Sequence, residues 1–210
     1  MTTPITIDSV VLEVDDVATA EAFYSVLGVA DRVHVRTAEA PTSGFRGYTL
    51  SLVVSQPGNV EAYVRAAVNA GATVLKPAKK SFWGYGGVVQ APGGAIWKFA
   101  TSAKKDTGGA TLEYDHQVLL LGVDDVKATK QFYVDHGLEV GKCFGSKYVE
   151  FKVSEPDIQL SLYTRRAAAK DAGVDAEGTG SHRLAVRGDA GEFTDPDGFA
   201  WEASTADRIG

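Results

Sequence analysis

The sequence predicts an α+β fold made of two tandem modules, each a small curved sheet with a helix on one face. The main observation is internal repetition. The stretch "DDVATAEAFYSVLG" at 15–28 returns as "DDVKATKQFYVDHG" at 124–137, which is 109 residues later. A second match joins "TLSLVV" at 49–54 to "QLSLYT" at 159–164. Such self-similarity at a nearly fixed spacing is typical of a duplicated structural unit.

A third match lies near the end of each copy. "QAPGGAIWKF" at 90–99 resembles "TDPDGFAWEA" at 194–203, with a spacing of 104 residues. Lys98 in the first copy stands where the second has Glu202. We place the first module at 1–103, a polar, glycine-containing linker at 104–111 and the second module at 112–210.

Each module begins with an apolar, β-branched run, "SVVLEV" at 9–14 and "QVLLLGV" at 117–123, which predicts a strand. The Asp pair that follows is suited to cap a helix, and Gly28 and Gly137 stand where a helix end favours positive φ. The next strands are followed in the first module by a helix over 59–70.

That helix is expected to bury Val60, Val64 and Val68. The matching helix of the second module is expected to be short, near "RRAAAKDAG" at 165–173. Each module ends in a glycine-rich turn and a strand that carries a tryptophan.

The composition is that of an ordinary soluble globular protein. The chain has 210 residues, 44% hydrophobic and 23% charged, with a net charge of −6. This balance argues against nucleic-acid binding, which depends on clustered Lys and Arg. The single cysteine, Cys143, excludes an internal disulfide. No signal peptide or membrane span is evident, so we expect a cytoplasmic protein, either a monomer or a homodimer.

The stretches "VDDVATAEAFYSVLG", "VDDVKATKQFYVDHG" and "DPDGFAWE" resemble those of the vicinal oxygen chelate superfamily. This superfamily includes glyoxalases, extradiol dioxygenases and bleomycin-resistance proteins. The resemblance covers nearly the whole chain. It implies paired βαβββ modules whose mixed sheets curve around a pocket. It carries little information about activity, because one fold hosts many chemistries.

In metal-dependent members of this superfamily, a His on the first strand and a Glu on the last strand commonly ligate a divalent metal. The corresponding positions in the first module are Ser9 and Lys98, which do not form such a pair. In the second module they are Val118 and Glu202, with His116 two residues before Val118 on the same strand face.

His182, in "GTGSHRLAV", is a third possible ligand. If "GSHRLAV" matches "GFRGYTL", His182 begins a pocket strand. If the 104-residue spacing holds instead, His182 matches Ala78, and we prefer this second alignment. The resemblance therefore leaves open a site of His116, His182 and Glu202 for Fe, Mn, Zn or Ni.

The stretch "KKSFWGYGG" at 79–87 predicts a ligand-binding wall. Phe82, Trp83 and Tyr85 lie among three glycines there, and aromatic side chains offer large flat contacts. Core packing by the same aromatics is the competing interpretation. Four further residues are predicted to contribute to the pocket: Arg46, Lys98, Tyr163 and Glu202.

Two functions follow from these residues. The favoured one is a glyoxalase/bleomycin-resistance-like protein that binds a small, partly aromatic organic molecule without a metal. The alternative is a divalent-metal-dependent enzyme, a lyase, isomerase or extradiol-type dioxygenase, with its site in the second module. A scaffold subunit with a vestigial pocket is a third possibility.

Overall fold

A computed structural model describes residues 5–82, 84–152 and 158–204 of the chain. The first half contains, in order, β1 (Ile7–Val14), α1 (Val17–Leu27), β2 (Val33–Thr37), β3 (Tyr48–Val53), α2 (Pro57–Asn69), β4 (Thr73–Ser81), β5 (Gly84–Gln90) and β6 (Ile96–Thr101). The second half contains β7 (His116–Val123), α3 (Val126–Asp135), β8 (Val140–Phe144), β9 (Tyr148–Phe151), β10 (Gln159–Thr164), α4 (Arg165–Ala172), the 3₁₀ turn η1 (Ser181–Arg183), β11 (Leu184–Gly188), β12 (Phe193–Thr194) and β13 (Ala200–Ala203). The predicted α+β class is confirmed.

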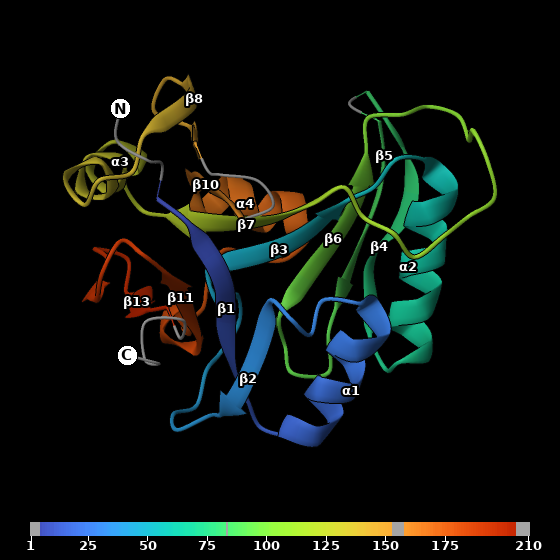
Figure 1. The fold of residues 1–210 in the computed structure, drawn as a ribbon, viewed down its shortest axis with the longest axis horizontal. Helices are drawn as coiled ribbons and strands as arrows, with labels where there is room; N and C mark the ends of the chain where they lie inside the picture. Colours follow the sequence, from blue (N-terminus) through green and yellow to red (C-terminus); the bar gives the residue numbers. More distant parts are fainter. Residues whose placement is uncertain (1–4, 83, 153–157, 205–210) are drawn as a thin grey trace.

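The larger sheet has the strand order β4-β5-β6-β3-β7-β10-β9-β8. It consists of two βαβββ units, one from β3 to β6 and one from β7 to β10. In each unit the last strand lies parallel beside the first, β6 beside β3 and β10 beside β7. The antiparallel pair β3–β7 joins the units into one continuous curved sheet (Figure 1).

The smaller sheet has the order β12-β13-β11-β1-β2 and combines strands from both ends of the chain. Strand β1 pairs antiparallel with β11, which in turn lies parallel to β13. Both halves of the chain therefore contribute strands to both sheets, and Figure 1 shows β1 beside β11 although the sequence separates them widely.

Strand pairing shows which parts of the two halves are equivalent. Strands β1 and β7 each precede a helix capped by Asp. Strand β13 lies parallel to β11, which pairs antiparallel with β1, and β6 lies parallel to β3, which pairs antiparallel with β7. The matches at spacings of 109 and 104 residues therefore relate equivalent elements. The match between 49–54 and 159–164 joins β3 to β10, and these two strands are not equivalent. Strand β3 runs antiparallel to β7, whereas β10 runs parallel to β7. Six residues of alternating apolar character are common to many strands, which explains the misleading similarity.

The counterpart of β3 is instead β11, since each pairs antiparallel with a first strand and parallel with a last strand. The alignment of "GSHRLAV" with "GFRGYTL" is therefore the correct one, and the preferred match of His182 to Ala78 is wrong. The structure places His182 in η1, exposed and just before β11.

Helix boundaries follow local chemistry. The Asp16 side chain accepts a hydrogen bond from the Thr19 amide at 3.0 Å, and Asp125 accepts from two amides at the start of α3. Gly28 ends α1 at φ 69°. In α2 the expected burial of Val68 is wrong, since this side chain is 41% exposed. Tyr63 and Ala67 complete the buried face instead, as a period of 3.6 residues allows.

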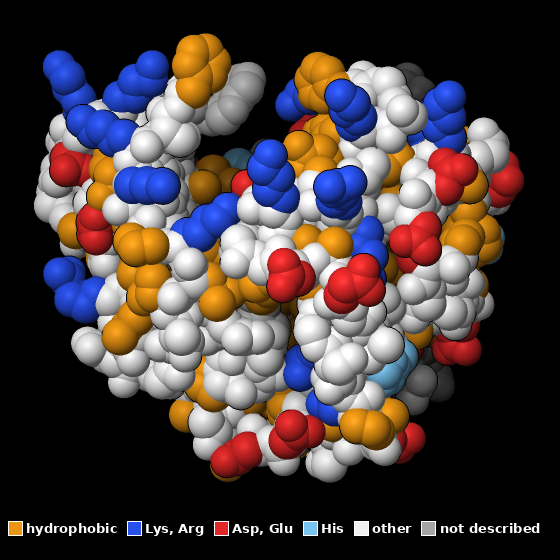
Figure 2. Space-filling model, turned by 180° about the vertical axis from the view of Figure 1, so that it is seen from behind, with side chains coloured by type: hydrophobic (Ala, Val, Ile, Leu, Met, Phe, Trp, Pro, Cys, Tyr) orange, Lys and Arg blue, Asp and Glu red, His pale blue; other side chains and the backbone are white. Residues whose placement is uncertain are grey.

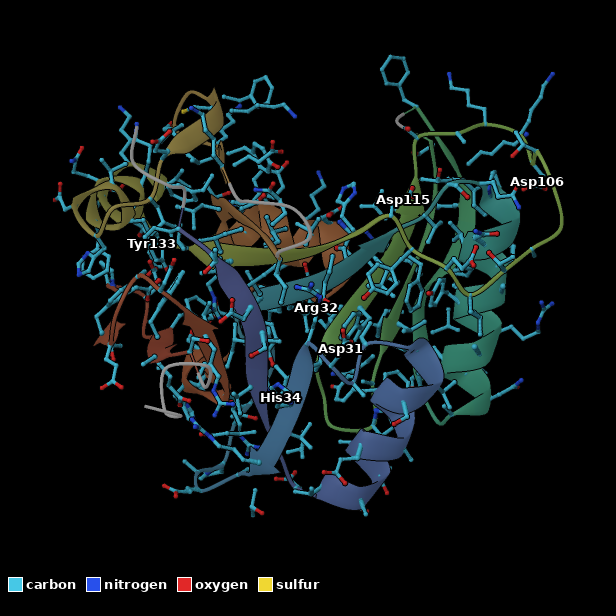
Figure 3. The ribbon with its side chains drawn as sticks, in the orientation of Figure 1. Asp31, Arg32, His34, Asp106, Asp115 and Tyr133 are labelled. Atoms are coloured by element: carbon cyan, nitrogen blue, oxygen red, sulfur yellow. The ribbon has the colours of Figure 1, made fainter. Side chains whose placement is uncertain are left out.

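The segment predicted as a linker lies along the start of α2 (Figure 3). Asp106 accepts a hydrogen bond from the Gly58 amide at 2.6 Å. The Gln56 side-chain oxygen accepts from the amides of Thr107 at 2.7 Å and Gly108 at 3.0 Å. These contacts satisfy amides and fix the path between the two halves.

Helices α2 and α4 cover opposite faces of the larger sheet. The Tyr63 ring of α2 stacks on Phe99 of β6, with ring centroids 5.2 Å apart. Helix α4 instead forms a small apolar cluster with Leu120 and Ile96. Because Ile96 and Phe99 point to opposite faces of β6, α4 is not the counterpart of α2, contrary to the sequence-based expectation. No helix within the described ranges is long and apolar enough to span a membrane.

Candidate functional site

A cavity of about 640 Å³ opens on the face of the larger sheet that carries α4. Helix α4 rests on one end of this face through small side chains, including Ala168 and Ala172. The rest of the face stays open as far as the β8–β9 turn. The lining residues come from seven elements and the β8–β9 turn: Ser51, Val53, Lys98, Ala100, Val118, Leu120, Phe144, Lys147, Tyr148, Ser161, Tyr163 and Asp171.

The floor of the cavity is a row of side chains across three neighbouring strands. Val118 of β7, Ser51 of β3 and Lys98 of β6 are paired positions in the sheet and therefore lie side by side. The Lys98 ammonium donates a hydrogen bond to the Asp171 carboxylate of α4 and forms an ion pair with it. The charge of Lys98 is thus balanced by a carboxylate of α4, which lies on the concave face of the sheet.

Aromatic side chains form the opposite wall. The rings of Tyr148 and Tyr163 meet edge to face, with centroids 5.9 Å apart. The Tyr148 hydroxyl group lies 3.2 Å from both Ser161 Oγ and Glu150 Oε2. Burial raises the pKa of Tyr148, and the nearby Glu150 also raises it. The phenol therefore remains protonated at neutral pH and donates its proton to Glu150.

A second, smaller hollow of about 260 Å³ adjoins the first over β4, β5 and β6. The two hollows share Lys98, Ala100 and Asp171. Gly86 lies beside Ala100 in the sheet, so its missing side chain leaves room on this face. Figure 2 shows a deep notch between the two raised parts of the molecule, with hydrophobic and Lys or Arg side chains around it.

The structure brings only part of the predicted aromatic wall together. Tyr163 lines the cavity. Tyr85 borders the smaller hollow, but its hydroxyl group donates a hydrogen bond to Glu61 of α2, on the other side of the sheet. Phe82 is 83% exposed at the end of the β4–β5 hairpin. Trp83 lies outside the described residues.

Arg46, which was predicted to contribute to the pocket, lies elsewhere. Its guanidinium group donates a hydrogen bond to the backbone oxygen of Gly93 at 2.8 Å. It lines neither hollow.

Glu202 lies in the smaller sheet and is held by two arginines. Arg36 donates to it at 2.5 Å and Arg187 at 3.2 Å, while Arg36 also bonds Glu13 at 3.1 Å. Burial alone would raise the pKa of Glu202, but its hydrogen bonds and ion pairs with Arg36 and Arg187 lower it below the usual value. Strand register places Ser9, Arg187 and Glu202 in one row, equivalent to Val118, Ser51 and Lys98.

Lys98 and Glu202 therefore occupy equivalent positions in two different sheets, each with its own partner of opposite charge. The reversed charge at the end of the repeat is balanced by local ion pairs in both sheets.

The residues at these two positions do not fit a divalent metal. The row with Lys98 offers a cation, a hydroxyl group and an apolar side chain, and the Glu202 carboxylate is already bound by guanidinium groups. Metal sites need several deprotonated or neutral donors free to converge. Within the described residues, no group of three His, Cys, Asp or Glu side chains could hold a metal ion.

The three alternative ligands are distributed over separate elements. His116 is exposed at the start of β7, where it pairs with Val53 at the edge of the cavity. His182 lies in η1, and Glu202 lies on β13 in the other sheet.

Sequence reasoning missed several lining residues, chiefly Ser51, Tyr148, Ser161 and Asp171. The two serines could have been recognised in the sequence as candidate lining residues, because each interrupts an apolar strand in the pattern Leu-Ser-Leu. No sequence pattern identifies Asp171, since it reaches the cavity only because α4 packs on the concave face of the sheet.

No family model matches the chain, and no curated protein matches it by sequence. Solved structures do resemble it. Glyoxalase I from Zea mays superposes with a TM-score of 0.62 over 98% of this chain and 94% of that protein, at 13% identity. A Bacillus subtilis protein described as a candidate dioxygenase gives a TM-score of 0.52 over 89% of this chain and 71% of that one, at 14% identity.

The chain therefore shares its fold with these two proteins, a fold that the sequence resemblance also implied. At this level of identity the likeness concerns the fold, and the chemistry must be argued from the site.

Proposed function

We propose that this protein binds a small, partly aromatic organic molecule in the cavity of the larger sheet, and that binding needs no metal ion. The observation that carries the proposal is the cavity itself. Its volume of about 640 Å³ lies in the range typical of small-molecule sites. Its lining is mostly apolar and aromatic with a few polar groups, the usual composition of such sites.

Each part of the lining has a role in this proposal. Val118 and Leu120 provide an apolar floor, and Tyr148 and Tyr163 provide flat walls for ring contacts. Hydroxyl groups such as that of Ser161 orient the ligand. Burying ~100 Å² of aromatic surface at ~25 cal/mol per Å² contributes about 2.5 kcal/mol before the costs of association.

The experiment uses N-phenyl-1-naphthylamine (NPN), a neutral aromatic probe whose fluorescence rises in apolar surroundings. We expect saturable NPN binding that survives prior treatment of the protein with EDTA. Val118→Trp should weaken binding about ten-fold or more, because Val118 faces the open cavity and a larger side chain fills it. Val26→Trp is the matched control, since Val26 is 46% exposed on α1, away from the cavity.

Two results would contradict the proposal. Equal NPN affinity in the Val118→Trp variant and the wild type would show that the probe does not occupy this cavity. Loss of binding with EDTA and its return with Fe²⁺, Mn²⁺, Zn²⁺ or Ni²⁺ would favour the metal-dependent enzyme instead. The residues to replace next would then be His116, His182 and Glu202.

A further inference from the structure

Lys98 lies where the two hollows of the larger sheet meet. It lines both, together with Ala100 and Asp171. Its side chain is 22% exposed and that of Asp171 is 45% exposed. An ion pair that water reaches to this extent is weak, because solvent screens the charges and both side chains lose freedom. The Asp171 carboxylate is therefore a partner that another anion can replace.

Most of the charged side chains that line the two hollows are cations. Four lysines line them among the described residues: Lys76, Lys79, Lys98 and Lys147. Asp171 is the one carboxylate in the same lining. Lys76 is occupied, since its ammonium group donates to the backbone oxygens of Lys170 and Asp171, near the end of α4, at 2.8 and 2.6 Å. Lys98 is then the cation placed at the centre, with lysines on both sides.

The space on either side of Lys98 suits different parts of one ligand. On one side lie the apolar floor and the rings of Tyr148 and Tyr163. On the other side lies the smaller hollow, which the absence of a side chain at Gly86 keeps open. An aromatic body in the first space places an attached acidic group next to the Lys98 ammonium.

We propose that the ligand of this protein is an aromatic anion, whose acidic group displaces Asp171 from Lys98 on binding. This inference rests on the proposed function, because it names the chemical class of the molecule that the cavity takes. In the free protein, the Asp171 carboxylate then occupies the place of the ligand's acidic group beside Lys98. It holds Lys98 in place when no ligand is bound and competes with the ligand for it.

The test compares two probes that differ by one acidic group. NPN is neutral, and 8-anilinonaphthalene-1-sulfonate (ANS) is the same aromatic body with a sulfonate. Both are titrated by fluorescence into the wild type and three variants, Lys98→Met, Asp171→Asn and Lys152→Met. Lys152→Met is the matched control, because Lys152 forms an exposed ion pair with Glu139 and lines neither hollow.

We expect ANS to bind the wild type about ten-fold or more tightly than NPN, the scale of a hydrogen bond to a charged group. Lys98→Met should remove this preference, so that the affinities of ANS and NPN for this variant lie within about two-fold of each other. Asp171→Asn should raise the ratio of ANS to NPN affinity several-fold, because the internal competitor is gone. Lys152→Met should change neither affinity. A variant with a loosened core would bind both probes more tightly, so the ratio of the two affinities separates misfolding from a local effect.

The outcomes distinguish this inference from the proposed function. If NPN binds in the cavity but Lys98→Met leaves the ratio of ANS to NPN affinity unchanged, the anionic ligand is refuted and the binding function stands. If Asp171→Asn weakens ANS binding selectively, Asp171 is not a competitor, and that part of the inference is refuted. If neither probe binds the wild type, the proposed function fails as well.

Discussion

Replacing Tyr133 by phenylalanine removes a single hydroxyl group from a buried hydrogen-bond network. Tyr133 of α3 is fully buried (labelled in Figure 3). Its hydroxyl donates to Asp195 Oδ2 at 2.8 Å and accepts from the indole nitrogen of Trp201 at 3.2 Å. The other carboxylate oxygen of Asp195 accepts two backbone amides, from Asp197 and Phe199, at 2.9 Å each. The hydroxyl group thus ties α3 to the "DPDG" turn and the strand that follows it.

The repeat supplies a matched control in the same chain. Tyr24 and Trp97 are the counterparts of Tyr133 and Trp201, with ring centroids 5.8 Å apart against 5.7 Å in the second copy. The counterpart of Asp195 is Ala91, which offers no carboxylate. Among the described residues, the buried Tyr24 hydroxyl accordingly has no hydrogen-bond partner.

The two substitutions should therefore change the free energy of unfolding by different amounts. Tyr133→Phe leaves an indole N–H and a carboxylate oxygen unpaired, so the free energy of unfolding should fall by about 2 kcal/mol. For a chain of this size that corresponds to a decrease in Tm of roughly 4–8 °C. Tyr24→Phe removes no hydrogen bond, and the change should stay within about 0.5 kcal/mol.

Urea denaturation followed by far-UV circular dichroism measures both variants, since this signal does not depend on the tryptophan next to the substitution. If the two variants lose equal stability, or if Tyr24→Phe is the more destabilised, then the hydrogen bond to Asp195 does not contribute as argued.

Two further predictions concern the smaller sheet and a strand end. The lowered pKa of Glu202 means that its ion pairs stabilise the fold above its ordinary pKa near 4.5 and are lost as pH falls through the lower folded-state value. Glu202→Gln should therefore cost about 1 kcal/mol at pH 7, as expected for a partly exposed site, and almost nothing in strong acid. Urea midpoints measured across this range test the sign, and a cost that grows on acidification contradicts it. Gly84→Ala should lower Tm by several degrees, because Gly84 has φ 140° and a side chain would overlap the neighbouring backbone. Gly108→Ala, which meets open space, is the control for differential scanning calorimetry, and equal Tm values for the two variants would refute the argument.

The sequence by itself determined the parts of this protein that depend on short stretches of chain. The Asp residues at 16 and 125 cap helices, and Gly28 and Gly137 end them with positive φ, because capping and chain reversal involve groups a few residues apart. The repeat, the two helices that contain Phe-Tyr and the Asp-Pro-Asp-Gly turn were sufficient to predict the fold. They also predicted the equivalence of Lys98 and Glu202, which strand register confirms.

The candidate site depended on contacts that no local pattern encodes. Sequence similarity suggested two self-contained modules, whereas the strands of both halves share both sheets. Ser51 therefore lies next to Val118, and Ser9 shares a row with Glu202. The neighbours of a strand are determined by the hydrogen bonds and packing of the complete sheet, so the sequence of one strand does not specify them.

The position of α4 was decided in the same way. The pattern of "RRAAAKDAG" predicts a short helix, and its alanines suit close packing, but neither property chooses a face of the sheet. Only the curvature of the larger sheet creates the concave surface on which α4 lies, and only that placement brings Asp171 to Lys98. The sequence thus determined which elements form. The tertiary structure decided which charges meet, because ion pairs and cavities are made between residues far apart in the chain.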